Sequence, residues 1–299
     1  MTFENNFVKW VHATLPSTAK VLLGNGDDAA LLSSSPRGTL VATDMLLDGT
    51  HFVVGQTPPE LIGRKAVSVN FSDMAAMGGT PDSIFISLAV PRSTCPKWLE
   101  RVMTGAAEMA REFNCGIDGG DTNSWNGPFA INVCVVGRPH WRGPVSRLGA
   151  KDQDVVMVSG GRLGDTLASG HHLNFTPRIK EAQWLLDHFE IHSMMDLSDG
   201  LASDAPRLAK ASAVKIVLEV EKIILAPWDA KNLRSALCDG EDFELLFTCS
   251  PANAVEIEHK FPWSCGIRRI GTVEKGEGVY LLHPNQTETQ LLDLHGYEH

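Results

Sequence analysis

Seven aspartates share a setting that could do chemistry, because each lies in a glycine turn or at the end of an apolar run. They are Asp27, Asp28, Asp44, Asp73, Asp121, Asp196 and Asp199. Oxygen ligands in such number suit Mg²⁺, a hard cation that also keeps waters and substrate phosphates in its coordination shell. Several Mg²⁺ ions in a cleft serve phosphoryl transfer, where the protein positions reactants and neutralises charge. The acids therefore indicate a nucleotide-dependent enzyme.

Other metal and nucleotide sites lack their sequence signatures. The chain has no H-E-x-x-H motif and no clustered Cys or His spacing, which argues against zinc. No Gly-Lys dipeptide occurs, so there is no Walker A motif, and the protein-kinase motifs H-R-D and D-F-G are also absent. A different kind of ATP-binding architecture is required.

Asp73 lies in the stretch R-K-A-V-S-V-N-F-S-D-M-A-A-M-G-G, which begins at Arg64. The pattern predicts a helix over 59–77 that ends at two glycines. Helical spacing surrounds Asp73 with small and apolar side chains, so its carboxylate needs a cation from elsewhere. The alternative is a helix cap or a satisfied core acid.

Asp44 is expected at the end of the strand at 39–43. Two further acids, Asp196 and Asp199, stand near a predicted helix start. In M-M-D-L-S-D-G-L, Ser198 or Asp199 is positioned to cap the helix that runs through Leu208, in which case one of these acids is only a cap.

The elements that must position these residues alternate between strands and helices, which predicts an α/β fold of the α+β type with two domains. The predicted N-terminal domain is 1–138, the linker is the Pro-, Gly- and Arg-rich stretch 139–151, and the C-terminal α/β domain is 152–299. Strands are expected at 21–23, 39–43, 84–90, 129–136, 154–159, 214–220, 243–248, 267–273 and 279–282. Helices are expected at 3–14, 59–77, 96–113, 177–189, 198–208 and 251–260.

Composition fits an ordinary globular chain, since 299 residues are 43% hydrophobic and 21% charged. A formal net charge of −10 argues against nucleic-acid and membrane partners. The N-terminus lacks the basic and apolar regions of a signal peptide, so we expect a cytoplasmic location. The six cysteines are dispersed and are expected to be free thiols.

Seven motifs together resemble the thiamine-monophosphate kinases, within the superfamily of aminoimidazole-ribonucleotide synthetase and selenophosphate synthetase. The resemblance covers nearly the whole chain and follows the family's order. The motifs are G-D-D-A-A from Gly26, T-D-M-L-L-D-G-T-H-F from Thr43, K-A-V-S-V-N-F-S-D-M-A-A-M-G-G from Lys65, G-G-D-T from Gly119, R-L-G-A-K from Arg147, D-L-S-D-G-L from Asp196 and G-E-D-F-E-L-L-F-T from Gly240.

The resemblance implies a role for each matched position, and a homodimer formed through the N-terminal sheets. The implied Mg²⁺ ligands are Asp28, Thr43, Asp44, Asp73, Asp121, Asp196 and Asp199. The implied ATP contacts are Gly120, Asp121, Arg147 and Ser198, and the implied substrate contacts are His51, Glu241 and Tyr297. The implied reaction is direct phosphoryl transfer from ATP to thiamine monophosphate, and no catalytic base is assigned because a phosphate nucleophile is already ionised near neutral pH.

Three departures from the family's pattern keep an alternative open. Ala42 stands where the family often has a hydroxyl residue, Asp239 stands where a glycine is usual, and the segment 165–178 is short. The closing G-Y-E-H also lacks the family's final Phe, which bears on the role of Tyr297. The alternative is a catalytically silent relative that binds nucleotide or thiamine phosphate as a regulator, or a related ATP-dependent enzyme. A selenophosphate synthetase is disfavoured because the first cysteine is Cys95, and a hydrogenase-maturation relative because there is no C-terminal cysteine.

Overall fold

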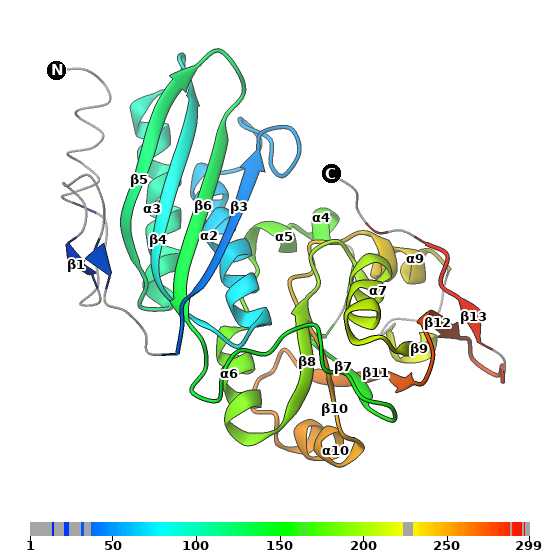
Figure 1. Ribbon diagram of the computed structural model, residues 1–299. Coiled ribbons are helices and arrows are strands. Elements are labelled where there is room, and N and C mark those ends of the chain that lie inside the picture. Colours follow the sequence, from blue (N-terminus) through cyan, green and yellow to red (C-terminus); the bar gives the residue numbers. More distant parts are fainter. Residues whose placement is uncertain are drawn as a thin grey trace. The chain divides into compact units, whose positions relative to one another are not determined.

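The computed structural model describes residues 14, 21–23, 31–32, 37–161, 163–164, 166–223, 230–287, 289–294 and 296. The chain divides into two compact units. Unit 1 comprises Met1–Met74, Gly79–Trp141 and Leu173–Thr176, and unit 2 comprises Ala75–Gly78, Arg142–His172 and Pro177–His299. Each contains a sheet with helices, so the predicted α/β class is confirmed (Figure 1).

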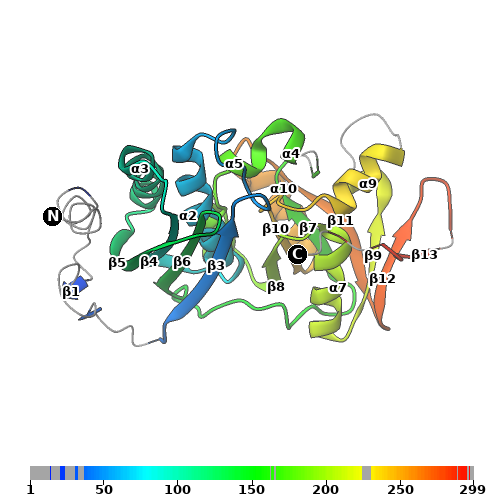
Figure 2. The same cartoon turned by 90° about the horizontal axis from the view of Figure 1, so that it is seen from above.

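Unit 1 is built on a four-stranded sheet with the order β3-β6-β4-β5, in which only β4 and β5 are parallel among the described pairs. Its elements are β3 (Leu40–Leu47), α2 (Pro59–Ala76), β4 (Thr80–Pro91), α3 (Pro96–Glu112), β5 (Gly116–Trp125) and β6 (Ala130–Arg138). Both helices cover the same face of this sheet, as the view from above shows (Figure 2). The opposite face carries no helix of unit 1 in the described part of the chain.

The two helices of unit 1 approach each other through glycines. A Cβ atom on Gly63 of α2 would lie 1.8 Å from the carbonyl oxygen of Val102, and one on Gly105 of α3 would lie 1.9 Å from that of Glu60. Both positions therefore exclude any larger residue at this helix spacing. Most of α2 is buried, and even Lys65 is 0% exposed.

A short antiparallel hairpin precedes this sheet. It joins β1 (Val21–Leu23) to β2 (Leu31–Leu32), with Val21 opposite Leu32. The predicted strand at 21–23 is thus confirmed. Asp27 and Asp28, which stand between the two strands in sequence, lie outside the described residues, as does most of the predicted helix 3–14.

Unit 2 holds a seven-stranded sheet with the order β13-β12-β9-β11-β7-β10-β8. Its strands are β7 (Val155–Ser159), β8 (Ile191–Asp196), β9 (Lys215–Glu219), β10 (Leu245–Cys249), β11 (Ile267–Glu274), β12 (Gly278–Leu282) and β13 (Gln290–Leu291). The remaining helices are α4 (Thr166–Ser169), α5 (His171–Asn174), α6 (Ile179–His188), α7 (Leu201–Ser212), α8 (Val220–Ile223), α9 (Ala230–Cys238) and α10 (Pro251–Lys260).

Helix α7 packs its apolar side chains into the main core of unit 2. Leu201, Ala205 and Leu208 are each 0% exposed and join the buried side chains of the sheet. This packing fixes α7, and with it the turn that leads into its first residue. That turn carries Ser198 and Asp199, two of the predicted site residues, and directly follows Asp196 at the end of β8.

The predicted end of one strand was wrong, and a strand that carries two predicted site residues was not expected. β3 continues past Asp44 to Leu47, so Asp44 lies inside a strand and not at its end. The glycine-rich stretch 116–125 forms strand β5, although no strand was expected there. In both cases pairing with a neighbouring strand, β6 or β4, extends the ladder beyond what local propensity favours.

Other general expectations can be compared directly. All six cysteines are free thiols, as predicted, although Cys95 is exposed while Cys115 and Cys249 are buried. Burial raises the pKa of the Cys249 thiol to about 12, so it is inert. In the described part of the chain, no helix is long and apolar enough to cross a bilayer.

Candidate functional site

In unit 1, Thr43 and Asp44 stand next to each other on β3 and are linked to Asn132 of β6. The Asn132 side-chain amide donates to the Thr43 hydroxyl (3.0 Å) and to the Asp44 carbonyl oxygen (3.1 Å). The Thr43 hydroxyl donates in turn to the carbonyl oxygen of Val133 at 3.1 Å. Asn132 therefore fixes this corner of the sheet, a role that the sequence did not reveal.

Gly120 and Asp121 lie on β5, at the other edge of the same sheet. The Asp121 carboxylate accepts hydrogen bonds from the Thr122 amide and from the Asn123 side chain, both at 2.8 Å. Gly120 has a φ of +155°, and a Cβ there would lie 2.0 Å from the carbonyl oxygen of Ile86. The close approach of two strands, rather than a ligand, is thus sufficient to require this glycine.

The sheet order separates Asp44 from Asp121. β6 and β4 lie between their strands, and neighbouring strands are about 4.8 Å apart, which places the two backbones about 14 Å from each other. Two carboxylates on one Mg²⁺ must each come within about 2.1 Å of the ion. The structure does not bring this pair together on a single ion.

Asp73 lies in the last turn of α2, which ends at Ala76. It therefore cannot be the N-cap of this helix, and that alternative is excluded. A negative charge near a helix C-terminus is disfavoured by the helix dipole, and α2 has no basic residue in its last turn. A bound cation near Asp73 would offset this unfavourable charge.

His51 belongs to a tight turn after β3. The Leu47 amide donates to the His51 ring Nδ1 at 3.0 Å, and the His51 amide donates to the Leu47 carbonyl oxygen at 3.0 Å. The buried Lys65 ammonium donates to the His51 carbonyl oxygen at 2.9 Å. Because Nδ1 accepts a hydrogen bond, the neutral ring in this arrangement carries its proton on Nε2.

In unit 2, Asp196, Ser198 and Asp199 follow one another where β8 leads into α7. The predicted capping role of Ser198 or Asp199 is wrong, because the N-cap is Gly200 and no side chain caps the helix. Instead the Asp199 carboxylate pairs with the Arg207 guanidinium at 2.5 Å, and its amide donates to the Asp204 carboxylate at 3.0 Å. Asp204 and Arg207 lie one helical turn apart on α7. Both side chains contact Asp199 and so stabilise the segment that leads into the helix.

The charge of this turn is strongly negative. Burial, followed by the nearby Asp196 carboxylate, raises the pKa of Asp204 to about 7, despite the opposing effect of Arg207. Asp204 was missed in the sequence, where its only signal is an acid in the first turn of an apolar helix, five residues after Asp199. Excess negative charge of this kind is what a bound cation relieves.

Glu241 belongs to a strained turn that contacts the Asp196–Asp199 segment. Glu241 and Phe243 have φ values of +56° and +50°, which are costly for residues with side chains. The Glu241 amide donates to the Ser198 carbonyl oxygen at 2.7 Å, and the Phe243 amide donates to that of Leu197 at 2.8 Å. The structure thus brings Glu241 and Ser198 together.

Two buried acids, Asp242 and Glu244, stabilise the turn at 240–243 through hydrogen bonds to other segments of unit 2. Neither was identified from the sequence. Asp242 accepts a hydrogen bond from the Gly164 amide at 2.7 Å, and burial raises its pKa well above the usual value. Glu244 pairs with Arg178, whose Nε lies 2.7 Å from it, and accepts from the Ser159 hydroxyl at 2.5 Å. These contacts stabilise an otherwise unfavourable backbone.

The remaining predicted residues are Arg147, Asp28 and Tyr297. Arg147 is exposed in the irregular segment before β7. Asp28 and Tyr297 lie outside the described residues. Next to Tyr297 in sequence, the Gly296 amide donates to the Ser203 hydroxyl at 2.9 Å, and a Cβ on Gly296 would lie 1.9 Å from the Asp199 carbonyl oxygen.

Carboxylate oxygens, which Mg²⁺ prefers, predominate among the donor atoms at these positions. Within the ranges that the structure describes, no three His, Cys, Asp or Glu side chains form a ready-made metal cluster. The donors nevertheless fit Mg²⁺ chemically, because they are hard carboxylate and hydroxyl oxygens, and because Asp199 stands beside a further acid, Asp204, whose carboxylate accepts from its amide. Among the described ligands, Thr43, Asp44, Asp73 and Asp121 belong to unit 1, and Asp196 and Asp199 belong to unit 2.

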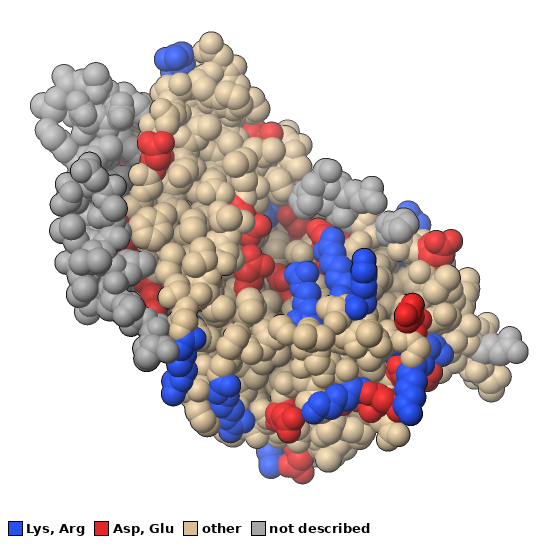
Figure 3. Space-filling model, viewed as in Figure 1, with Lys and Arg blue, Asp and Glu red and all other residues tan. Residues whose placement is uncertain are grey.

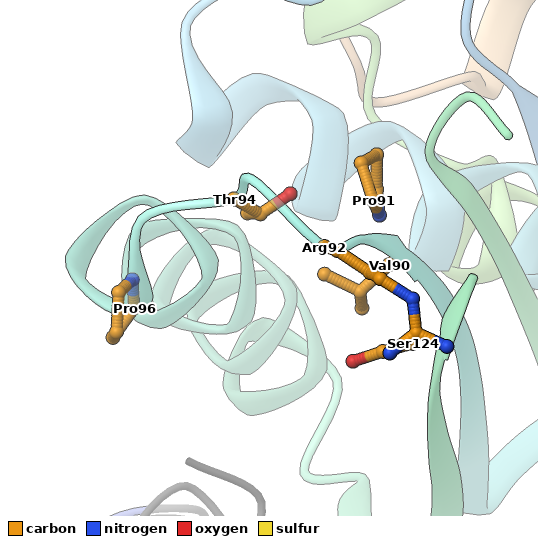
Figure 4. Close-up of a pocket in the computed structure, with 6 residues that line it drawn as sticks. All are labelled: Val90, Pro91, Arg92, Thr94, Pro96 and Ser124. Atoms are coloured by element: carbon orange, nitrogen blue, oxygen red, sulfur yellow. The ribbon is translucent and has the colours of Figure 1, made fainter. Parts of the chain in front are cut away.

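A pocket of about 320 Å³ opens in unit 1, away from these motifs (Figure 4). It is lined by Val90, Pro91, Arg92, Thr94, Pro96 and Ser124. The Arg92 side chain extends toward Ser124, and its Nε donates to Asn126 at 3.2 Å. None of the predicted site residues lines this pocket.

Comparison with known families covers most of the chain. Residues 26–138 match the AIR synthase related protein N-terminal domain, and residues 151–283 match the corresponding C-terminal domain. A thiamine-monophosphate kinase from Rhodopirellula baltica is 33% identical over 294 residues, which cover 93% of this chain and 91% of the relative.

Solved structures agree with this result. A thiamine-monophosphate kinase from Stenotrophomonas maltophilia superposes with a TM-score of 0.79 at 28% identity, covering 94% of this chain and 96% of the other. AaThiL, solved in complex with AMPPCP and TMP, superposes with a TM-score of 0.73 at 29% identity, covering 96% and 94%.

Proposed function

The chain belongs to the thiamine-monophosphate kinases, within the AIR synthase related family, and on this premise we propose that it phosphorylates thiamine monophosphate with ATP. The products are thiamine diphosphate and ADP. The protein is then a phosphotransferase with a phosphate group as acceptor, and ATP is its co-substrate.

One observation within unit 2 carries the proposal furthest. The hydrogen bond from the Glu241 amide to the Ser198 carbonyl oxygen joins the segment expected at the thiamine end to the segment expected at ATP. A phosphoryl donor and acceptor must meet in line, so their binding segments need to be neighbours. The strained φ values of Glu241 and Phe243 support a functional rather than a structural reason for this turn.

We assign the residues as follows. Asp28, Thr43, Asp44, Asp73, Asp121, Asp196 and Asp199 would hold Mg²⁺. Gly120, Asp121, Arg147 and Ser198 would contact ATP, and His51, Glu241 and Tyr297 would contact thiamine monophosphate. Bound Mg²⁺ would supply compensation for the negative charge of the phosphates. Since Asp44 and Asp121 are too far apart to share an ion, the proposal requires more than one.

The chain's own groups have two tasks in this reaction. Arg147 neutralises phosphate charge through a planar guanidinium, and the His51 ring is a proposed contact of the substrate. No residue is needed as a general base, because the second pKa of the acceptor phosphate is about 6. The two phosphates repel each other, and catalysis consists mainly of bringing them together.

The test is incubation of the protein with ATP, Mg²⁺ and thiamine monophosphate, followed by chromatography for thiamine diphosphate. We expect product, and we expect its formation to stop in excess EDTA while the melting temperature of the ligand-free protein stays unchanged. Binding of both substrates without product would instead support the silent regulatory relative. Full turnover in EDTA would overturn the metal assignment.

We also propose that two copies associate through the helix-free face of the unit 1 sheet. On β3 of this sheet, Val41, Met45 and Leu47 are 63%, 56% and 39% exposed. The part of this face seen in Figure 3 is largely free of charged side chains, and such a face favours burial against a second copy. Sedimentation at twice the 32.5 kDa chain mass is the expected result. The cytoplasmic location stays a prediction from the sequence.

A further inference from the structure

The segment that carries Arg147 has no regular secondary structure, yet it is bound along its length within unit 2. The Val145 amide donates to the Met77 carbonyl oxygen at 3.2 Å, and the Met194 amide of β8 donates to that of Ser146 at 3.0 Å. Gly149 has a φ of +134°, and a Cβ there would lie 2.2 Å from the carbonyl oxygen of His192. The segment therefore lies directly against β8.

Ser212, the last residue of α7, makes three hydrogen bonds to this segment. Its hydroxyl donates to the Arg147 carbonyl oxygen at 2.8 Å and accepts from the amides of Gly149 and Ala150, each at 3.1 Å. A serine hydroxyl has one proton to donate and two lone pairs, so its bonding capacity is used completely. One side chain thus fixes the backbone on both sides of Leu148.

The Arg147 guanidinium itself remains available. The side chain is exposed, and among the residues that the structure describes it forms no ion pair. A long exposed side chain has many rotamers, so its useful position depends on a fixed backbone. The backbone carbonyl that Ser212 holds belongs to Arg147 itself.

The same helix also holds the other predicted nucleotide segment. At the start of α7, the Asp204 carboxylate accepts from the Asp199 amide, and the preceding Ser198 is an expected ATP contact. α7 has 12 residues and is therefore about 18 Å long. Its two ends set the separation between the Arg147 segment and the Ser198–Asp199 turn.

We propose that Ser212 is a positioning residue for nucleotide binding, which holds Arg147 in place relative to Ser198 at the opposite end of α7. The inference rests on the proposed function, in which Arg147 and Ser198 serve ATP. Ser212 does not touch the nucleotide in this role. It acts through the backbone of Arg147.

The test compares Ser212→Ala and Ser212→Thr in the full chain, using calorimetric binding of ATP with Mg²⁺ and no thiamine monophosphate. Ser212→Ala should bind ATP about tenfold more weakly, since the segment loses its three hydrogen bonds, whereas Ser212→Thr keeps the hydroxyl and should bind normally. The matched control is Ser250→Ala, which removes a hydroxyl that accepts from the Asn253 amide at 3.2 Å and caps α10. Both alanine variants should melt about 2–4 °C lower, but only Ser212→Ala should lose ATP affinity.

A double variant separates positioning from a general loss of order. Because Ser212 acts through Arg147, Arg147→Ala with Ser212→Ala should bind ATP no more weakly than Arg147→Ala alone. Normal affinity of Ser212→Ala, an equal loss in Ser250→Ala, or fully additive losses would each overturn the inference. If the wild type binds ATP but forms no thiamine diphosphate, the proposed function fails, whereas Ser212 is still judged on ATP binding. A wild type that binds no ATP overturns both.

Discussion

The two units hold their predicted ligands in different ways. In unit 1, Thr43, Asp44 and Asp121 project from regular strands, and their positions follow from sheet register. In unit 2, Asp196 ends a strand and Asp199 stands on an irregular turn, which is held by side chains from α7 and by the strained turn at 240–243.

This difference indicates where each unit is vulnerable. A strand ladder distributes its support over many backbone hydrogen bonds, so replacing one ligand in unit 1 should change charge and little else. The turn in unit 2 depends on a few buried polar contacts, each of which is costly to break. Loss of function and loss of stability should therefore separate in unit 1 and coincide in unit 2.

The largest expected effect is in unit 1, at Asp73. Asp73→Asn removes one charge and keeps the size of the side chain, so turnover should fall by about 100-fold or more as phosphate charge loses compensation. The ligand-free protein should be no less stable, because a negative charge in the last turn of α2 is unfavourable. The checks are the rate of thiamine diphosphate formation and the apo melting temperature. Near-normal turnover would remove Asp73 from the active site.

Next in size is the buried ion pair of unit 2. Arg178 and Glu244 have side chains only 13% and 5% exposed, so Arg178→Ala leaves a buried carboxylate unpaired and should cost about 3–5 kcal/mol. The control in unit 1 is Arg101→Ala, whose pair with Glu60 is 57% and 36% exposed, so its loss should destabilise the protein far less. Urea unfolding measures both. Equal losses would contradict the proposed difference between the units.

The last expected effect is a pH dependence at Asp242. Burial raises its folded pKa above the usual 3.8, an effect reinforced by Glu244, Asp239 and Asp204 and opposed by the Gly164 amide. The folded state therefore keeps a proton that the unfolded state has lost, and stability falls as the pH rises above 3.8, by at most about 1.4 kcal/mol per pH unit.

Asp242→Asn tests this point because it does not ionise and still accepts from Gly164. Between pH 5 and pH 8, the free energy of unfolding of the wild type should fall relative to that of Asp242→Asn. Parallel pH profiles for the two proteins would show that Asp242 is not the group responsible.

Much of this protein was determined by its sequence alone. The apolar periodicity of 251–260 gave α10 with its limits, and the spacing of 59–77 gave α2 to within one residue. These are local signals, because helix periodicity and proline at a helix start depend on neighbouring residues. The seven motifs likewise led to the family that the comparisons establish.

Only the tertiary structure decided how the candidate site is held. Strand β5 forms in a glycine-rich stretch because β4 pairs with it, and Gly200 replaces the expected cap because Asp204 and the turn at 240–243 occupy the groups around Asp199. Asp242 and Gly164 are 78 residues apart, and Ser212 and Arg147 are 65 apart. Such contacts join segments that are far apart in the sequence. The local pattern of one segment does not indicate its partner, because only long-range packing and burial bring the two together.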